Sequence, residues 1–66
     1  MKLKDLKVGD YFKFTDPVYP SLYVVCDDHG VKRTFSLTNN RIHEYDRYLE
    51  WEVVRMYFNM EYAIWE

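Results

Sequence analysis

At 66 residues, the chain has room for one small domain with a single hydrophobic core. Its 48% hydrophobic and 30% charged content argue against intrinsic disorder. Nine Lys and Arg residues are scattered among eleven Asp and Glu residues, and the net charge is −2. A clustered basic surface, which binding to nucleic-acid phosphates requires, is therefore not expected.

The chain opens with a short amphipathic lead-in, a turn and a strand. Apolar residues at positions 3, 6 and 8 lead into the Gly9-Asp10 turn. Residues 11–15 then alternate as a strand, with Phe12 and Phe14 on one face. Such an opening is typical of a small, strongly curved β-barrel.

A hairpin is predicted next, after a loop that contains Pro17 and Pro20. Its first strand, residues 22–27, is apolar on both faces and should therefore lie centrally in a sheet. The tip at Asp28-His29-Gly30 predicts a tight turn, with Gly30 at positive φ.

The strand that follows the hairpin tip, residues 31–38, has two faces of different composition. We expect the face with Val31, Phe35 and Leu37 to point into the core. The opposite face, with Lys32, Thr34 and Ser36, then points to solvent. Arg33 interrupts the inward row near the hairpin end, where its head group can reach water.

Two further strands are expected after a second tight turn. Asn39-Asn40 predicts that turn, because Asn tolerates the left-handed region. Residues 41–45 follow as a short strand with Ile42 pointing inward. Residues 49–53 alternate cleanly, and the Val53-Val54 doublet shifts the phase as a β-bulge would.

The last twelve residues, 55–66, are compatible with two structures. Apolar residues at positions 53, 57, 60 and 64 lie at helical spacing. The alternative is a hairpin that turns at Asn59-Met60 and ends in a strand over residues 62–65. We favour the hairpin, because aromatic and β-branched residues prefer pleated surfaces.

Five or six short antiparallel strands predict an all-β fold, a small SH3-like barrel that forms a single domain over residues 1–66. The alternatives are an OB-type barrel, which usually carries a helix between strands, and a barrel with a C-terminal helix. The expected core consists of Leu6, Val8, Phe12, Phe14, Val24, Phe35, Leu37, Ile42, Trp51 and Val53.

Residues that could support chemistry are few. Cys26 and His29 lie three positions apart, but a zinc site needs about four ligands and His43 is the only other histidine. A nucleophilic Cys–His pair would also need a positioned base and an oxyanion pocket. We therefore predict an unreactive Cys26 and a protein that is not an enzyme, with no catalytic residue, cofactor or metal site.

Four segments of the chain resemble a known class of protein. They are the opening "LKDLKVGDYFKF", the strand "LYVV", the segment "TFSLTNN" and the acidic-alternating strand "LEWEVV". Together they resemble short SH3-like-barrel accessory proteins of bacteriophages and bacterial mobile elements, which often open with "DLKxGDxF". The resemblance covers residues 3–54 and implies a protein that binds and modulates a bacterial host protein, for example as an inhibitor. It transfers no functional residues, because the motif positions are structural.

Aromatic residues make up 20% of the chain, which points to a protein-binding surface. Tyr57, Tyr62 and Trp65 lie beyond the barrel segments, and we expect them to form a site for a host protein or for homodimer formation. Glu50 and Glu52 are expected to form the polar rim of that site. The competing functions are an oligomeric structural or assembly component, and a barrel that binds nucleic acid by stacking bases.

The expected compartment is the cytoplasm, which is the host cytoplasm if the protein is phage-encoded. The lone Cys26 cannot form an internal disulfide, which fits a reducing environment. No apolar run approaches the ~20 residues of a membrane span, and the lysines near the start are not followed by a signal-peptide core.

Overall fold

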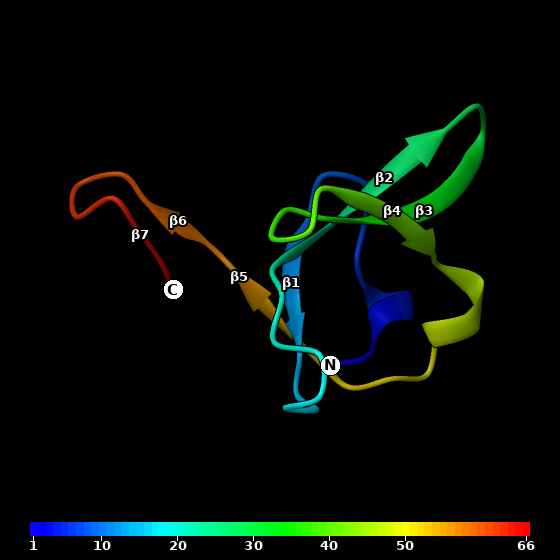
Figure 1. Ribbon diagram of the computed structural model, residues 1–66, viewed down its shortest axis with the longest axis horizontal. Helices are drawn as coiled ribbons and strands as arrows, with labels where there is room; N and C mark the ends of the chain where they lie inside the picture. The colour runs from blue at the N-terminus through cyan, green and yellow to red at the C-terminus, as the bar shows by residue number, and fades with distance from the viewer.

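The computed structural model describes all 66 residues, and its regular elements are antiparallel strands and two short 3-10 helices (Figure 1). Five strands form one sheet in the order β4-β3-β2-β1-β5, so the last strand returns to pair with the first. They are β1 (Tyr11–Phe14), β2 (Tyr23–Asp28), β3 (Val31–Ser36), β4 (Arg41–Glu44) and β5 (Val53–Met56). The predicted small SH3-like barrel is confirmed, and the apolar strand β2 is central as predicted.

The turns form where the sequence predicted them. Asp28 pairs with Val31, which leaves His29 and Gly30 as a two-residue loop with φ of 52° and 85°. Two successive positive φ angles suit the right-handed twist of a hairpin. The Gly30 N–H also donates to Asp27 Oδ1 at 2.7 Å. The second turn likewise places Asn40 in the left-handed region, at φ 57°.

The N-terminal segment closes one side of the barrel against the chain that leads into β5. It contains the 3-10 helix η1 (Leu3–Asp5). The Leu3 N–H donates to the Trp51 carbonyl at 3.1 Å, and the Val53 N–H donates to the Met1 carbonyl at 2.8 Å. These bonds satisfy the Trp51 carbonyl and the Val53 N–H. If residues 49–53 formed the predicted strand, these groups would instead pair within the sheet.

Strand β5 differs from its prediction in position and regularity. It begins only at Val53, because the second 3-10 helix, η2 (Asp46–Tyr48), and a turn occupy the preceding residues. The predicted bulge at Val53-Val54 is wrong: Val53 pairs with Phe14 and Val54 with Lys13 in unbroken register.

The hydrophobic core lies between strands β1, β2 and β5 and the N-terminal segment, and Tyr45 joins it after β4. Its members are buried and form one cluster: Leu3, Leu6, Phe12, Tyr23, Val25, Tyr45 and Val53. Three of these, Leu6, Phe12 and Val53, were predicted. Phe14 is half-buried and packs against the cluster, and the rings of Phe12 and Tyr23 stack at 5.5 Å. Trp51, another predicted core residue, is half-buried.

The predicted orientation of β3 is wrong. Thr34 and Ser36 are fully buried, whereas Phe35 is half-buried and Leu37 is exposed. The cause lies in β2, where Tyr23 and Val25 fill the core and fix which face of the sheet is inside. Register then determines the orientation of β3, because paired antiparallel residues share a face: Thr34 pairs with the buried Val25.

The same constraint overturns the other misplaced core predictions. Val24 precedes the buried Val25 and faces outward, half-buried. Ile42 pairs with Phe35, points outward and is exposed, so His43 points inward instead. Val8 is also exposed; it lies in the turn before β1 rather than under the sheet.

The last nine residues contain a hairpin of two short strands, β6 (Phe58–Asn59) and β7 (Ile64–Trp65), which we call the tail hairpin. The predicted hairpin is confirmed and the helical alternative is wrong, but the turn lies later than the predicted Asn59-Met60 and the last strand is shorter than the predicted residues 62–65. The turn spans residues 60–63, because Asn59 Oδ1 accepts the backbone N–H groups of Glu61 at 3.0 Å and Tyr62 at 3.3 Å. In Figure 1 the tail hairpin projects beyond the barrel from the end of β5.

Candidate functional site

The outward face of the sheet carries an apolar row that crosses all five strands. Tyr11 pairs with Met56 on one side and with Val24 on the other. Val24 pairs with Phe35, and Phe35 pairs with Ile42. Paired side chains point to the same face, so these five lie in one line from β5 to β4. We call this line the outer row.

The outer row is only partly covered by protein. Ile42 is 56% exposed and its other four members are half-buried. Val54 and Leu37 lie two residues from Met56 and Phe35, share their face and are also exposed. A connected apolar surface of this kind is uncommon on a monomeric protein and marks interaction sites.

The tail hairpin continues the outer row. The Trp65 ring lies 4.7 Å from the Tyr11 ring between centroids, and Phe58 lies 5.2 Å from Trp65. Tyr57 and Tyr62, the other two aromatic residues of the predicted site, are 57% and 67% exposed. The structure therefore brings the predicted Trp65 onto the sheet and leaves both tyrosines accessible at the hairpin.

Tyr57 connects the hairpin to β5 through a cation–π contact. The Arg55 guanidinium lies 4.8 Å from the centre of the Tyr57 ring, and it also pairs with Asp10 at 3.0 Å. Backbone bonds between Tyr57 and Glu66 close the open end of the hairpin. These contacts hold the tail hairpin beside β1 and β5 while its turn stays in solvent.

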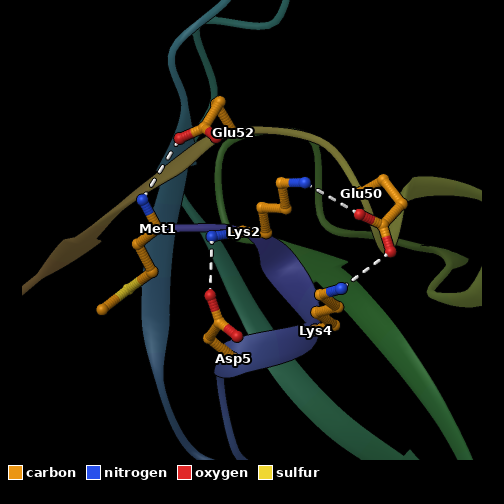
Figure 2. A network of polar contacts seen from close by, with 6 residues as sticks. All are labelled: Met1, Lys2, Lys4, Asp5, Glu50 and Glu52. Atoms are coloured by element: carbon orange, nitrogen blue, oxygen red, sulfur yellow. Dashed lines mark hydrogen bonds and ion pairs between the residues drawn. The ribbon is translucent and has the colours of Figure 1, made fainter.

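The structure does not bring Glu50 and Glu52 to the tail hairpin. Both precede β5, whereas the hairpin follows it, and an extended strand at about 3.3 Å per residue separates Glu52 from Tyr57 by on the order of 16 Å. Instead they face the N-terminal segment (Figure 2). Glu52 binds the Met1 amino group at 3.1 Å, and Glu50 binds Lys2 and Lys4, each at 3.0 Å.

This ionic network shifts two pKa values. Hydrogen bonds from Lys2 and then Lys4 hold the pKa of Glu50 below its ordinary value of 4.5. The hydrogen bond to Glu50 raises the pKa of Lys2 in turn. All the partners are solvent-exposed, so the network orients the N-terminal segment and adds little stability.

Cys26 and His29 form no assembled chemical site. Cys26 is half-buried on β2, and burial, followed by the charge of Asp28, raises the pKa of its thiol. A raised pKa reduces the fraction of reactive thiolate at neutral pH. His29 is almost fully exposed at the hairpin tip and pairs with Asp28 at 3.1 Å. No group of three or more His, Cys, Asp or Glu side chains is arranged to hold a metal ion.

Sequence reasoning missed the outer row because it assigned three of its members, Val24, Phe35 and Ile42, to the core. The available signal was Arg33. It shares a face with Phe35, and a charged residue within a row is more easily placed on an outward face than in a core.

Comparison of the chain with family models, curated proteins and solved structures finds no match. None of its helices has the length and apolar character needed to cross a membrane.

Proposed function

We propose that the chain is a non-enzymatic protein-binding module whose contact surface is the outer row together with the tail hairpin. The observation that carries the proposal is the continuity of this surface. Apolar side chains from all five strands lie in register, and the Tyr11–Trp65 contact extends the line into the hairpin.

The composition of the surface fits protein recognition. Interface cores are enriched in aromatic residues and Met and depleted of charge, and Tyr and Trp dominate binding energy. The surface contains Tyr11, Met56 and Trp65 on the sheet side and the exposed tyrosines of the hairpin. Resemblance to phage accessory proteins suggests a bacterial host protein in the cytoplasm as the partner, which the module would modulate or inhibit.

Homodimer formation is the second candidate. Strands β6 and β7 pair only with each other, so each leaves one edge without a neighbouring strand. Unpaired strand edges beside apolar side chains favour addition of a strand from another chain. A second copy of this chain could supply that strand.

Binding variants test the proposal. The wild-type chain is immobilised to capture a binding protein from bacterial lysate, and mass spectrometry identifies that protein. The captured protein is then purified, and calorimetry measures its affinity for the wild-type chain and for each variant. We expect Ile42→Glu and Tyr62→Ala each to weaken binding roughly tenfold or more. Val18→Glu, an exposed position in the loop between β1 and β2, is the matched control and should bind as wild type.

Equal affinity of Ile42→Glu and wild type for the captured protein would exclude the outer row from the interface. Sedimentation equilibrium at two concentrations tests self-association separately. A dimer that Ile42→Glu dissociates supports the second candidate, whereas a monomer with no captured partner contradicts both.

A further inference from the structure

The inner side of the sheet contains a cavity of about 230 Å³. Its lining consists of Phe14, Tyr19, Tyr23, Thr34, Asn39, His43 and Tyr48. An apolar cavity of about 150 Å³ holds a benzene molecule, so this one has room for a compact organic group. None of the lining residues belongs to the outer row or the tail hairpin, so a ligand site in this cavity is independent of the proposed function.

The cavity exists because β3 and β4 place small or polar side chains inside. Thr34 pairs with His43 across the two strands, and both line the cavity. Thr34 is buried, and its hydroxyl donates to the Glu44 carbonyl at 3.3 Å. Large apolar residues of the same strands, Phe35 and Ile42, face outward, so they do not fill the space.

His43 supplies an unused polar atom at this site. Its Nε2 is the only buried side-chain nitrogen or oxygen that lacks a hydrogen-bond partner. An unsatisfied buried polar atom is costly and rare in folded proteins. Nε2 has almost no accessible surface, so a group bound in the cavity reaches it only when the His43 ring turns toward the cavity. A hydrogen bond to that group would then remove this cost.

Aromatic rings form most of the cavity wall and stand at steep angles to one another. Phe14 is inclined by 58° to Tyr19, 59° to Tyr48 and 73° to Tyr23. His43 is inclined by 73° to Tyr23. Rings in several orientations can direct negative π faces toward a common space, which attracts organic cations.

The polar groups of the wall are also suited to a cation. Burial raises the pKa of the Tyr23 phenol, a hydrogen bond with Ser21 opposes this shift, and the nearby Tyr48 and Tyr19 raise the pKa further. All three tyrosines line the cavity. Their oxygens can accept hydrogen bonds. No Lys or Arg lines the cavity, whereas Arg47, outside the lining, already places its guanidinium 5.9 Å from the Tyr48 ring centre.

We propose that this cavity binds an organic cation that carries an N–H group, either an alkylammonium or a guanidinium. The aromatic rings surround the charge, and the N–H donates to His43 Nε2. An anion is disfavoured, because ring faces repel negative charge and no cationic side chain lines the wall. The cation can come from an Arg or Lys side chain of a partner or from a free small molecule.

A pair of nearly isosteric probes tests the charge requirement. N-acetyl-arginine amide and its neutral counterpart N-acetyl-citrulline amide are titrated to about 10 mM, which would fill a site with a Kd of about 1 mM. Binding is followed by NMR through the backbone amides and the His43 imidazole. We expect saturable shifts at cavity residues for the arginine probe and at least roughly tenfold weaker binding of the citrulline probe. Equal affinities, or no shifts with either probe, would overturn the proposal.

Variants of Tyr19 and His43 test the site itself. Tyr19→Leu removes a ring face, whereas Tyr19→Phe keeps it and serves as the control. We expect Tyr19→Leu and His43→Leu to weaken the arginine probe severalfold and Tyr19→Phe to leave the aromatic contribution intact. A thermal melt of each variant verifies that it folds. If a variant does not fold, the comparison of the arginine and citrulline probes on the wild-type protein still tests the proposal. Unchanged affinity in both folded Leu variants would place the cation elsewhere.

A capped Gly-Arg-Gly peptide distinguishes the two sources of the cation. Tighter binding of the peptide than of free arginine assigns the cavity to a side chain of a partner protein. Tighter binding of free arginine assigns it to a small molecule.

Discussion

The sheet has two halves, β1, β2 and β5 in one and β3 and β4 in the other, in which apolar side chains point in opposite directions. In β1, β2 and β5 the inward positions include Phe12, Tyr23, Val25 and Val53, which are buried in one hydrophobic cluster. This half has the ordinary pattern, in which apolar side chains point into the core. It also contacts the N-terminal segment, and we infer that it supplies most of the stability of the domain.

In β3 and β4 the pattern is inverted. Thr34, Ser36 and His43 point inward, and Phe35 and Ile42 point outward. An apolar residue on the outside contributes less to folding than the same residue in the core, so this arrangement costs stability. We infer that the second half of the sheet is organised for recognition on both of its faces.

The largest expected effect is in the packed half. Phe12 is fully buried and contacts the rings of Phe14 and Tyr23. Phe12→Ala should therefore cost about 3–5 kcal/mol of unfolding free energy, which is enough to unfold so small a domain. Circular dichroism during thermal unfolding measures it; a cooperative melt near that of wild type would show that this half is not the source of stability.

Removal of the tail hairpin should have a smaller effect. Truncation after Met56 deletes no member of the hydrophobic cluster, but it removes the contacts of Tyr11 with Trp65 and of Arg55 with Tyr57. We expect a folded barrel that is less stable by about 1–2 kcal/mol and deficient in partner binding or self-association. Urea unfolding and calorimetry measure the two properties. Complete unfolding of the truncated chain would assign the tail to the core.

Phe35→Ala should affect binding more than stability. Sequence reasoning placed Phe35 in the core, where its loss would cost several kcal/mol; on the outward face, half-buried, it should cost only about 1 kcal/mol. Affinity for the partner should fall, because the outer row loses its aromatic member on β3. An unfolded variant would show that Phe35 points into the core, as the sequence predicted. Unchanged affinity for the partner would show that Phe35 is not part of the interface.

The smallest effect is expected at the exposed ionic network. Glu50→Gln should lower the melting temperature slightly at neutral pH and low salt, because the bonds to Lys2 and Lys4 lose their charge. The pKa of Glu50 is depressed in the folded state, so its contribution is present above the ordinary value of 4.5 and is lost as the pH falls through the lower folded value. The two proteins should therefore melt alike in strong acid. A difference that persists there would assign the effect to packing.

Local features of the fold were predictable from the sequence, because they depend on neighbouring residues. Gly30 and Asn40 adopt the left-handed conformations that their turns require. The alternation in β3 was also correct, but alternation defines two faces without stating which one is buried. Tyr23 and Val25 of β2 make that choice through register, which local sequence does not specify.

The candidate site was predictable only in its tail. The surplus aromatic residues marked Tyr57, Tyr62 and Trp65, but the contact of Trp65 with Tyr11 joins residues at opposite ends of the chain. Glu50 and Glu52 were assigned to the wrong neighbourhood for a similar reason. Their partners are at the N-terminus, which returns to them only in the folded protein.

The orientation of β3 supports both the outer row and the cavity, and a matched pair of variants tests it directly. Urea unfolding of Thr34→Asp and Phe35→Asp compares adjacent residues of one strand. We expect Phe35→Asp to keep a cooperative transition, at a lower urea concentration than wild type because Phe35 is half-buried. Thr34→Asp should lose it, because it buries an unpaired carboxylate and removes the donor to the Glu44 carbonyl. A folded Thr34→Asp beside an unfolded Phe35→Asp would contradict the inverted polarity of this strand.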